Sequence, residues 1–261
     1  MPFNRIQYAA LAWPVLTRTA AELGKISYKE LAESVGVHWR QCRLFLESIQ
    51  TYCIQKNLPP LTGLVVRRSD GLPGHGFIAW DIDNPEEAYE RVYAKDWSEE
   101  INPFHYAAFG ETEELLAHKL ILPVPDWETV YRKVEDRGMR QVIFRKALLQ
   151  IYGGQCAMSD CRAEDLLEAA HIAPWSECTP QEKLDVRNGL LLASTYHDLF
   201  DKGWITVNGN YRVIEGPDFP NGLQDRFVEW VTRHVLGRQL RMPADPQHRP
   251  LLDYIQRRND D

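Results

Sequence analysis

The stretch that most constrains the fold of this chain runs from His171 to Asp201. It reads as a strand, a loop, a second strand and a short helix. Residues 166–172 are mostly apolar and a proline follows soon after them, as expected for a buried strand. Residues 190–192 form a second apolar run, and the Asn-Gly pair before it favours a turn. The sequence therefore predicts two strands joined by a loop and followed by a helix.

The predicted helix spans about residues 195–202, and Gly203 can end it. His197 and Asp201 are four residues apart, so both side chains leave the same face of this helix. An imidazole and a carboxylate on one face can hold a divalent cation. His171, at the end of the first strand, can reach the same spot if the strands pair and the helix packs across them.

This pattern resembles the HNH nuclease family, whose core is a ββα-metal finger. The His, Asn and His of that motif fall on His171, Asn188 and His197. The order Ala-Ala-His-Ile-x-Pro-Trp, Arg-Asn-Gly-Leu-Leu-Leu and His-x-Leu-Phe-Asp-x-Gly is similar to a restriction-type branch of bacterial HNH proteins. The resemblance covers about residues 140–214.

The resemblance implies DNA hydrolysis to 5′-phosphate and 3′-hydroxyl ends, with His171, Asn188 and His197 as the catalytic residues. His171 is the candidate general base, because an imidazole with a pKa near ~6.5 can accept a proton at neutral pH. We expect Asn188 to brace the loop between the strands and so to orient His171. A divalent cation between His197 and Asp201 would bind the scissile phosphate, with Mg²⁺ expected first and Mn²⁺, Ni²⁺ or Zn²⁺ as alternatives.

One position departs from the family pattern. Many HNH proteins carry an acid or a histidine directly before the base, as another metal ligand, and this chain has Ala170 there. We expect water, a phosphate oxygen, Glu168 or Asp198 to complete the ligand shell instead.

Cys156 and Cys161 lie just before the first predicted strand. Some HNH proteins hold a structural zinc with two cysteine pairs, but no second pair follows here. The alternative is that both are small residues in a tight, buried turn.

The charge of the chain is unevenly distributed. The net charge is −7, which at first argues against a nucleic-acid partner. Residues 1–70 nevertheless carry +4, residues 71–136 carry −10 and residues 137–261 carry −1. Because salt screens charges beyond ~8–10 Å, a local basic patch is enough to bind phosphates.

The basic N-terminal region contains a helix-turn-helix pattern. Ser27 and Glu30 form a capping box, Gly36 ends a short helix, and a longer helix follows over residues 37–56. The longer helix begins with side chains suited to base edges or phosphates: His38, Trp39, Arg40 and Arg43. The alternative is a helical packing domain with a few surface arginines.

A strand predicted over residues 64–66 makes this region a candidate winged helix. The order Ile-Ser-Tyr-x-Glu-Leu-Ala, Val-Gly, Leu-Pro-Pro, Val-Val and Gly-Leu-Pro-Gly is similar to the DNA-binding domain of O6-alkylguanine alkyltransferases and alkyltransferase-like proteins. The alkyltransferase Pro-Cys-His-Arg site would fall near residues 59–62, where there is no cysteine. If the resemblance holds, DNA binding without alkyl transfer is expected.

Two more arginines, Arg145 and Arg187, are candidate DNA contacts. For Arg187, a salt bridge with Asp185 is an equal alternative. Beyond a hairpin predicted over residues 204–214, the C-terminal tail is locally basic and either lies on DNA or stays disordered.

The chain is thus predicted to be an α+β protein. Residues 1–80 would form a helix-turn-helix or winged-helix DNA-binding domain, residues 81–125 an acidic connector, and residues 126–261 a ββα-metal (HNH) nuclease domain. Its substrate would be double-stranded DNA, and its role restriction or defence; a homodimer would suit double-strand cleavage. No apolar run approaches the ~20 residues of a membrane span, and five irregularly spaced cysteines favour the cytoplasm.

Two other functions fit parts of the sequence. A DNA-binding regulator or modified-base recognition protein with an inactive nuclease site would explain Ala170 and the alkyltransferase-like pattern. The other possible function is cleavage of RNA, as an RNase.

Overall fold

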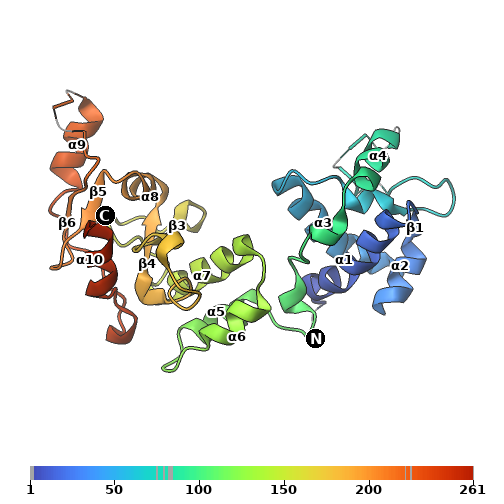
Figure 1. Cartoon of the computed structure of the whole chain (residues 1–261), viewed down its shortest axis with the longest axis horizontal. Helices are drawn as coiled ribbons and strands as arrows, with labels where there is room; N and C mark the ends of the chain where they lie inside the picture. Colours follow the sequence, from blue (N-terminus) through green and yellow to red (C-terminus); the bar gives the residue numbers. More distant parts are fainter. Residues whose placement is uncertain are drawn as a thin grey trace. The chain divides into compact units, whose positions relative to one another are not determined.

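The computed structural model describes residues 3–74, 76–78, 80–81, 85–220, 222–223 and 225–260. The chain divides into two compact units (Figure 1). The first comprises residues 1–112 with 134–136, and the second comprises residues 113–133 with 137–261. The segment predicted as an acidic connector therefore divides at Thr112, and most of it belongs to the first unit.

The first unit is mainly helical. Its elements are α1 (Arg5–Ala21), β1 (Ile26–Ser27), α2 (Tyr28–Val35), α3 (Cys42–Gln55), β2 (Val65–Val66) and α4 (Glu86–Ala94). β1 and β2 pair in parallel, with Ile26 opposite Val65. Buried side chains of α1 and α3 form the centre of the core, among them Trp13, Leu16 and Phe45.

Local capping sets the boundaries of α2. The predicted capping box is present, since Glu30 N donates to Ser27 Oγ at 3.2 Å and Ser27 N donates to Glu30 Oε2 at 2.9 Å. Gly36 ends the helix with φ +77°, a conformation that favours glycine. The next helix starts later than predicted, because a 3₁₀ turn capped by His38 precedes α3. The helix pair is thus present, and its assignment to the winged-helix class stays a prediction.

The second unit combines helices with two small antiparallel sheets. Its elements are α5 (Glu113–Leu120), α6 (Trp127–Lys133), α7 (Arg137–Ile151), β3 (Leu167–His171), β4 (Gly189–Ala193), α8 (Ser194–Asp201), β5 (Ile205–Val207), β6 (Val213–Glu215), α9 (Arg226–His234) and α10 (Leu252–Asp260). The structure as a whole is α+β, as predicted. None of the helices in the described part of the chain has the length and hydrophobicity that a membrane span needs.

The predicted strand–loop–strand–helix order is present in β3, β4 and α8. β3 and β4 are antiparallel, and His171 lies opposite Gly189. α7 packs against both strands (Figure 1). A Cβ atom on Gly189 would lie 2.7 Å from Phe144 Cζ and 2.8 Å from Leu148 Cδ2, so only glycine allows this close approach.

For the C-terminal tail, the sequence left two alternatives, that it lies on DNA or that it stays disordered. In the structure this tail forms α10 and packs on the same core. The Arg258 guanidinium lies 3.6 Å from the Phe200 ring centroid and donates to Ile172 O at 3.3 Å. Asn259 Nδ2 donates to Val207 O at 3.0 Å. The last helix therefore covers the hairpin and α8 with cationic and polar side chains.

Candidate functional site

His171 ends β3 and is held by packing on two rings. Its imidazole stacks on Phe144 with centroids 4.3 Å apart and planes at 14°, and it meets the Trp175 ring edge-on at 5.0 Å. Its Nε2 lies 3.0 Å from Lys183 O. A carbonyl oxygen only accepts, so Nε2 must carry the proton in this contact. The other nitrogen, Nδ1, is then the proton acceptor of the neutral ring.

The surroundings of His171 keep its imidazole neutral. Burial lowers its pKa to about 4, and the positive charges of Arg137 and Lys183 act in the same direction. The hydrogen bond to the Lys183 carbonyl and the charge of Asp201 oppose this shift. At neutral pH the ring is therefore unprotonated.

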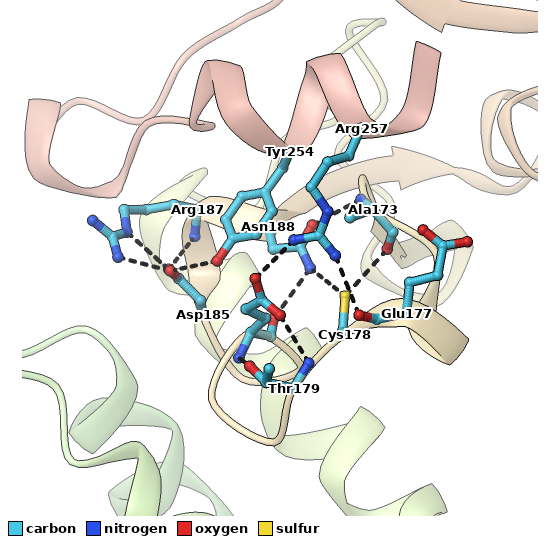
Figure 2. A network of polar contacts seen from close by, with 10 residues as sticks. Ala173, Glu177, Cys178, Thr179, Asp185, Arg187, Asn188, Tyr254 and Arg257 are labelled. Carbon is cyan, nitrogen blue, oxygen red and sulfur yellow. Dashed lines mark hydrogen bonds and ion pairs between the residues drawn. The ribbon is translucent and has the colours of Figure 1, made fainter. Parts of the chain in front are cut away.

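Asn188 lies fully buried directly before β4 and ties together the loop between the strands (Figure 2). Its Oδ1 accepts from Ala173 N at 2.8 Å. Its Nδ2 donates to Glu182 O at 3.1 Å and to Cys178 Sγ at 3.3 Å. Lys183 directly follows Glu182, and the Lys183 carbonyl contacts His171. By holding the Glu182 carbonyl, Asn188 therefore also fixes the position of the Lys183 carbonyl.

α10 supports the same loop from the other side. Arg257 Nη1 donates to Glu182 Oε1 at 2.7 Å, and Arg257 Nη2 donates to Glu177 O at 3.3 Å (Figure 2). Thr179 N donates to Glu182 Oε2 at 2.8 Å. This bond, with those to the Thr179 hydroxyl and Arg257, lowers the pKa of the Glu182 carboxyl and keeps it charged. The loop is thus held by Asn188 from within and by Arg257 from the surface.

His197 lies on α8 beside the β3 side chain of Glu168. The distance from His197 Nδ1 to Glu168 Oε2 is 3.7 Å. Asp201 is the last residue of α8, and its charge opposes the burial that lowers the pKa of His171 and Arg258. Ala170 is buried, and its methyl side chain has no atom that could bind a metal ion. Within the described residues, no group of three or more His, Cys, Asp or Glu side chains is arranged to hold a metal ion.

The comparison with known families concerns this same segment. Residues 156–208 match the family model for HNH endonucleases. The matched range contains β3, the Asn188 loop, β4 and α8. This segment is an HNH endonuclease domain. The curated proteins yield no match to the chain.

Cys156 and Cys161 lie in a tight turn. Cys156 N donates to Cys161 O at 3.0 Å, and Cys156 Sγ accepts from Ala193 N at 3.2 Å and Met158 N at 3.3 Å. Cys156 is buried, and its sulfur connects the turn to β4. This geometry fits the alternative of small residues in a tight turn, with Cys156 buried and Cys161 half-buried.

Both arginines that the sequence proposed as DNA contacts in the second unit have intramolecular partners. Arg145 Nε donates to Leu167 O at 2.7 Å, and its Nη2 donates to Glu164 O at 2.5 Å, which anchors the start of β3. Arg187 forms a two-pronged ion pair with Asp185, with contacts of 2.9 Å and 2.7 Å (Figure 2). The Asp185 side chain is buried and also accepts from Tyr254 Oη at 3.1 Å. The salt-bridge alternative for Arg187 is therefore present in the structure, and a DNA contact by either arginine stays a prediction.

The predicted DNA-contacting residues of the first unit lie together at the start of α3. His38, Trp39, Arg40 and Arg43 are all exposed. The Arg40 guanidinium lies 5.2 Å from the Trp39 ring centroid, and the rings of His38 and Trp39 are 5.6 Å apart. This cationic and aromatic patch has the composition of a nucleic-acid contact, and its role stays a prediction.

Three residues beside His171 were missed by the sequence reasoning. Trp175 touches its ring, and the side chains of Arg137 and Lys183 lie 5.0 Å and 5.3 Å from the Trp175 ring centroid. Trp175 falls inside the family motif, which could have drawn attention to it. No local pattern marks Arg137 or Lys183, because their positions depend on how α7 and the loop pack.

Proposed function

We propose that this protein is a metal-dependent DNA endonuclease whose HNH domain hydrolyses phosphodiester bonds to 5′-phosphate and 3′-hydroxyl ends. The observation that supports this best is the fixed orientation of His171. The contact of Nε2 with the Lys183 carbonyl leaves Nδ1 as the proton acceptor of the ring. Burial lowers the pKa of the ring to about 4, so the imidazole is unprotonated at neutral pH, although it is a weaker base than one with a pKa near ~7.

In the proposed reaction, His171 Nδ1 takes a proton from a water molecule as its oxygen attacks phosphorus. The bond from phosphorus to the 3′ oxygen breaks, the phosphate stays on the 5′ oxygen, and the departing 3′ oxygen takes up a proton from solvent to become the hydroxyl end. The imidazole becomes charged in this step, and the negative charge of Asp201 favours that charged form. Asn188 does not touch the substrate in this scheme; it positions Lys183 O and therefore His171.

The domain offers a partial set of donors for a divalent cation. His197 and Glu168 bring an imidazole and a carboxylate within 3.7 Å, and Asp201 follows His197 by one helical turn. Mg²⁺ commonly keeps several waters and binds through one or two carboxylates and substrate phosphate, so a site with few protein donors is compatible with it. When bound, the cation would supply charge stabilisation at the phosphate and the leaving oxygen. Mg²⁺ is the first expectation, with Mn²⁺, Ni²⁺ and Zn²⁺ as alternatives.

The exposed patch at the start of α3 supports double-stranded DNA as the substrate that the first unit selects. Arg40, Arg43 and His38 offer donors, and Trp39 offers an exposed ring. A role in restriction or defence rests on the likeness of the motif to the restriction-type branch. A homodimer would let two domains cut both strands.

The test is plasmid nicking alongside a gel-shift assay with the full chain. The His171→Ala variant should lose nicking activity in the presence of Mg²⁺ while keeping its affinity for DNA, because only the base is removed. His234→Ala is a matched control, since His234 is exposed on α9, away from the base. Full nicking activity in His171→Ala would remove His171 from the role of base.

One observation favours a second candidate function, a DNA-binding protein with an inactive nuclease site. Ala170 occupies the position of an expected ligand, and the described residues include no cluster of three metal-binding side chains. In that case the wild-type protein binds DNA but leaves plain, methylated and glucosylated DNA intact with Mg²⁺, Mn²⁺, Ni²⁺ and Zn²⁺ alike. Metal-dependent nicking of any of these substrates would exclude it.

A further inference from the structure

Trp175 brings two cationic side chains to the edge of the His171 site. The Arg137 guanidinium lies 5.0 Å from the centroid of the Trp175 ring, and Lys183 Nζ lies 5.3 Å from it. The same ring meets His171 edge-on at 5.0 Å. Arg137 comes from the start of α7 and Lys183 from the loop between β3 and β4. Two distant segments thus place their positive charges around one aromatic platform.

Among the residues that the structure describes, these two cations differ from several other basic side chains of the second unit in having no acidic partner. Arg187 is paired with Asp185, Arg257 with Glu182, and Lys146 with both Glu113 and Glu114. In the described part of the chain, neither Arg137 nor Lys183 forms an ion pair with a carboxylate. A cation–π contact attracts a cation but does not neutralise it. The positive charge beside His171 is therefore still available to an anion.

Both cations act electrostatically on the candidate base. Each of them contributes to the lowered pKa of His171, and each lies against the Trp175 ring that contacts the imidazole. The water that His171 would activate has to lie between this ring and a phosphodiester group. Each DNA phosphate carries one negative charge, so the positive charges of Arg137 and Lys183 would attract it to this position.

We propose that Arg137, Lys183 and Trp175 form a binding site for a backbone phosphate of the strand to be cut, at or next to the scissile bond. This inference rests on the proposed nuclease function. The planar guanidinium of Arg137 can take two phosphate oxygens at once, and Lys183 adds a point charge. Trp175 is the platform that holds both side chains beside His171.

The experiment measures DNA binding by the full chain as a function of salt. His171→Ala is the background, so that no cutting interferes, and the probe is a blunt duplex of plain DNA. Each single variant, Arg137→Gln or Lys183→Met, removes one positive charge, and the double variant removes two. Methionine keeps an unbranched side chain against Trp175. Arg233→Gln is the matched control, because Arg233 is an exposed arginine on α9. Far-UV circular dichroism checks that each variant is folded.

The slope of log K against log salt should weaken by about 0.9 for each single variant and by about 2 for the double variant, because each lost phosphate contact releases one counterion fewer. Affinity of the double variant should fall at least about tenfold at low salt, and Arg233→Gln should keep the parent slope. Arg137→Lys should restore most of the slope. An unchanged slope in the double variant, or no DNA binding by the parent, would overturn the proposal.

The two proposals can fail separately. If the wild-type protein never cuts DNA but the double variant loses the expected slope, the nuclease function fails and the phosphate site stands. If the wild-type protein cuts DNA and the double variant keeps the parent slope and full cutting rate, the phosphate site fails and the nuclease function stands.

Discussion

Asn188 is the residue whose replacement should link the stability of the HNH domain most directly to its activity. The Asn188→Ala variant leaves the Ala173 N–H and the Glu182 carbonyl without their side-chain partners, and it removes the donor to Cys178 Sγ. A buried backbone group left without a hydrogen bond costs ~1–3 kcal/mol. With two such groups, the free energy of unfolding should fall by about 2–6 kcal/mol.

The same variant should weaken the contact that fixes the His171 tautomer. The loop segment carrying Lys183 O follows the Glu182 carbonyl, so its release lets the 3.0 Å contact with His171 Nε2 lengthen. We expect nicking to drop by about 100-fold or more, a loss of ~2.7 kcal/mol in transition-state stabilisation. DNA affinity should change little, because Asn188 is buried.

Three measurements on Asn188→Ala test this reasoning. Urea unfolding gives the stability, plasmid nicking gives the activity, and ¹⁵N chemical shifts of the His171 ring report the tautomer, with Nε2–H expected in the wild-type protein. Asn102→Ala is the matched control, because Asn102 also makes two side-chain to backbone bonds, with Ala10 O and Phe104 N, in the other unit. If Asn188→Ala is destabilised while its tautomer and nicking rate match the wild type, the positioning role is refuted.

Three further predictions follow from the same site. The pKa of His171 is lowered to about 4, so the unfolded chain takes up a proton below pH ~6.5 before the folded chain does. The free energy of unfolding should therefore fall by up to about 3 kcal/mol between pH ~6.5 and 4. Urea unfolding of the His171→Gln variant should lack this loss. Gly189→Ala should cost about 1–3 kcal/mol, because its Cβ would displace Phe144, which stacks on His171, whereas Gly209→Ala meets no atom within 4 Å; equal thermal stability of the two would contradict the close approach. Chelation by EDTA should abolish nicking, and added Mg²⁺ should restore it; nicking that persists in EDTA would argue against metal dependence.

Local sequence was enough to predict the order of elements in the HNH domain. The apolar runs, the Asn-Gly pair and the helix end at Gly203 predict β3, β4 and α8 within a residue or two. The Ser27–Glu30 capping box likewise marks the start of α2. These features depend on neighbours within a few positions, so the chain encodes them locally.

Long-range packing decided which side chains surround the base. Arg145 turns to the carbonyls of Leu167 and Glu164, and Arg187 pairs with Asp185, although the sequence offered both as DNA contacts. Asn188 depends on both local sequence and long-range packing. Its place in the motif predicted that it braces the loop, and the tertiary fold determines which atoms it binds.

The environment of His171 likewise could not be read from the sequence. Its neutral state arises from burial against Phe144 and from the charges of Arg137 and Lys183, which come from α7 and from the loop. The sequence thus determined the elements and the residue types of the site. Only the tertiary structure decided the protonation and the partners of each side chain, because burial and charge at one atom are sums over segments far apart in the chain.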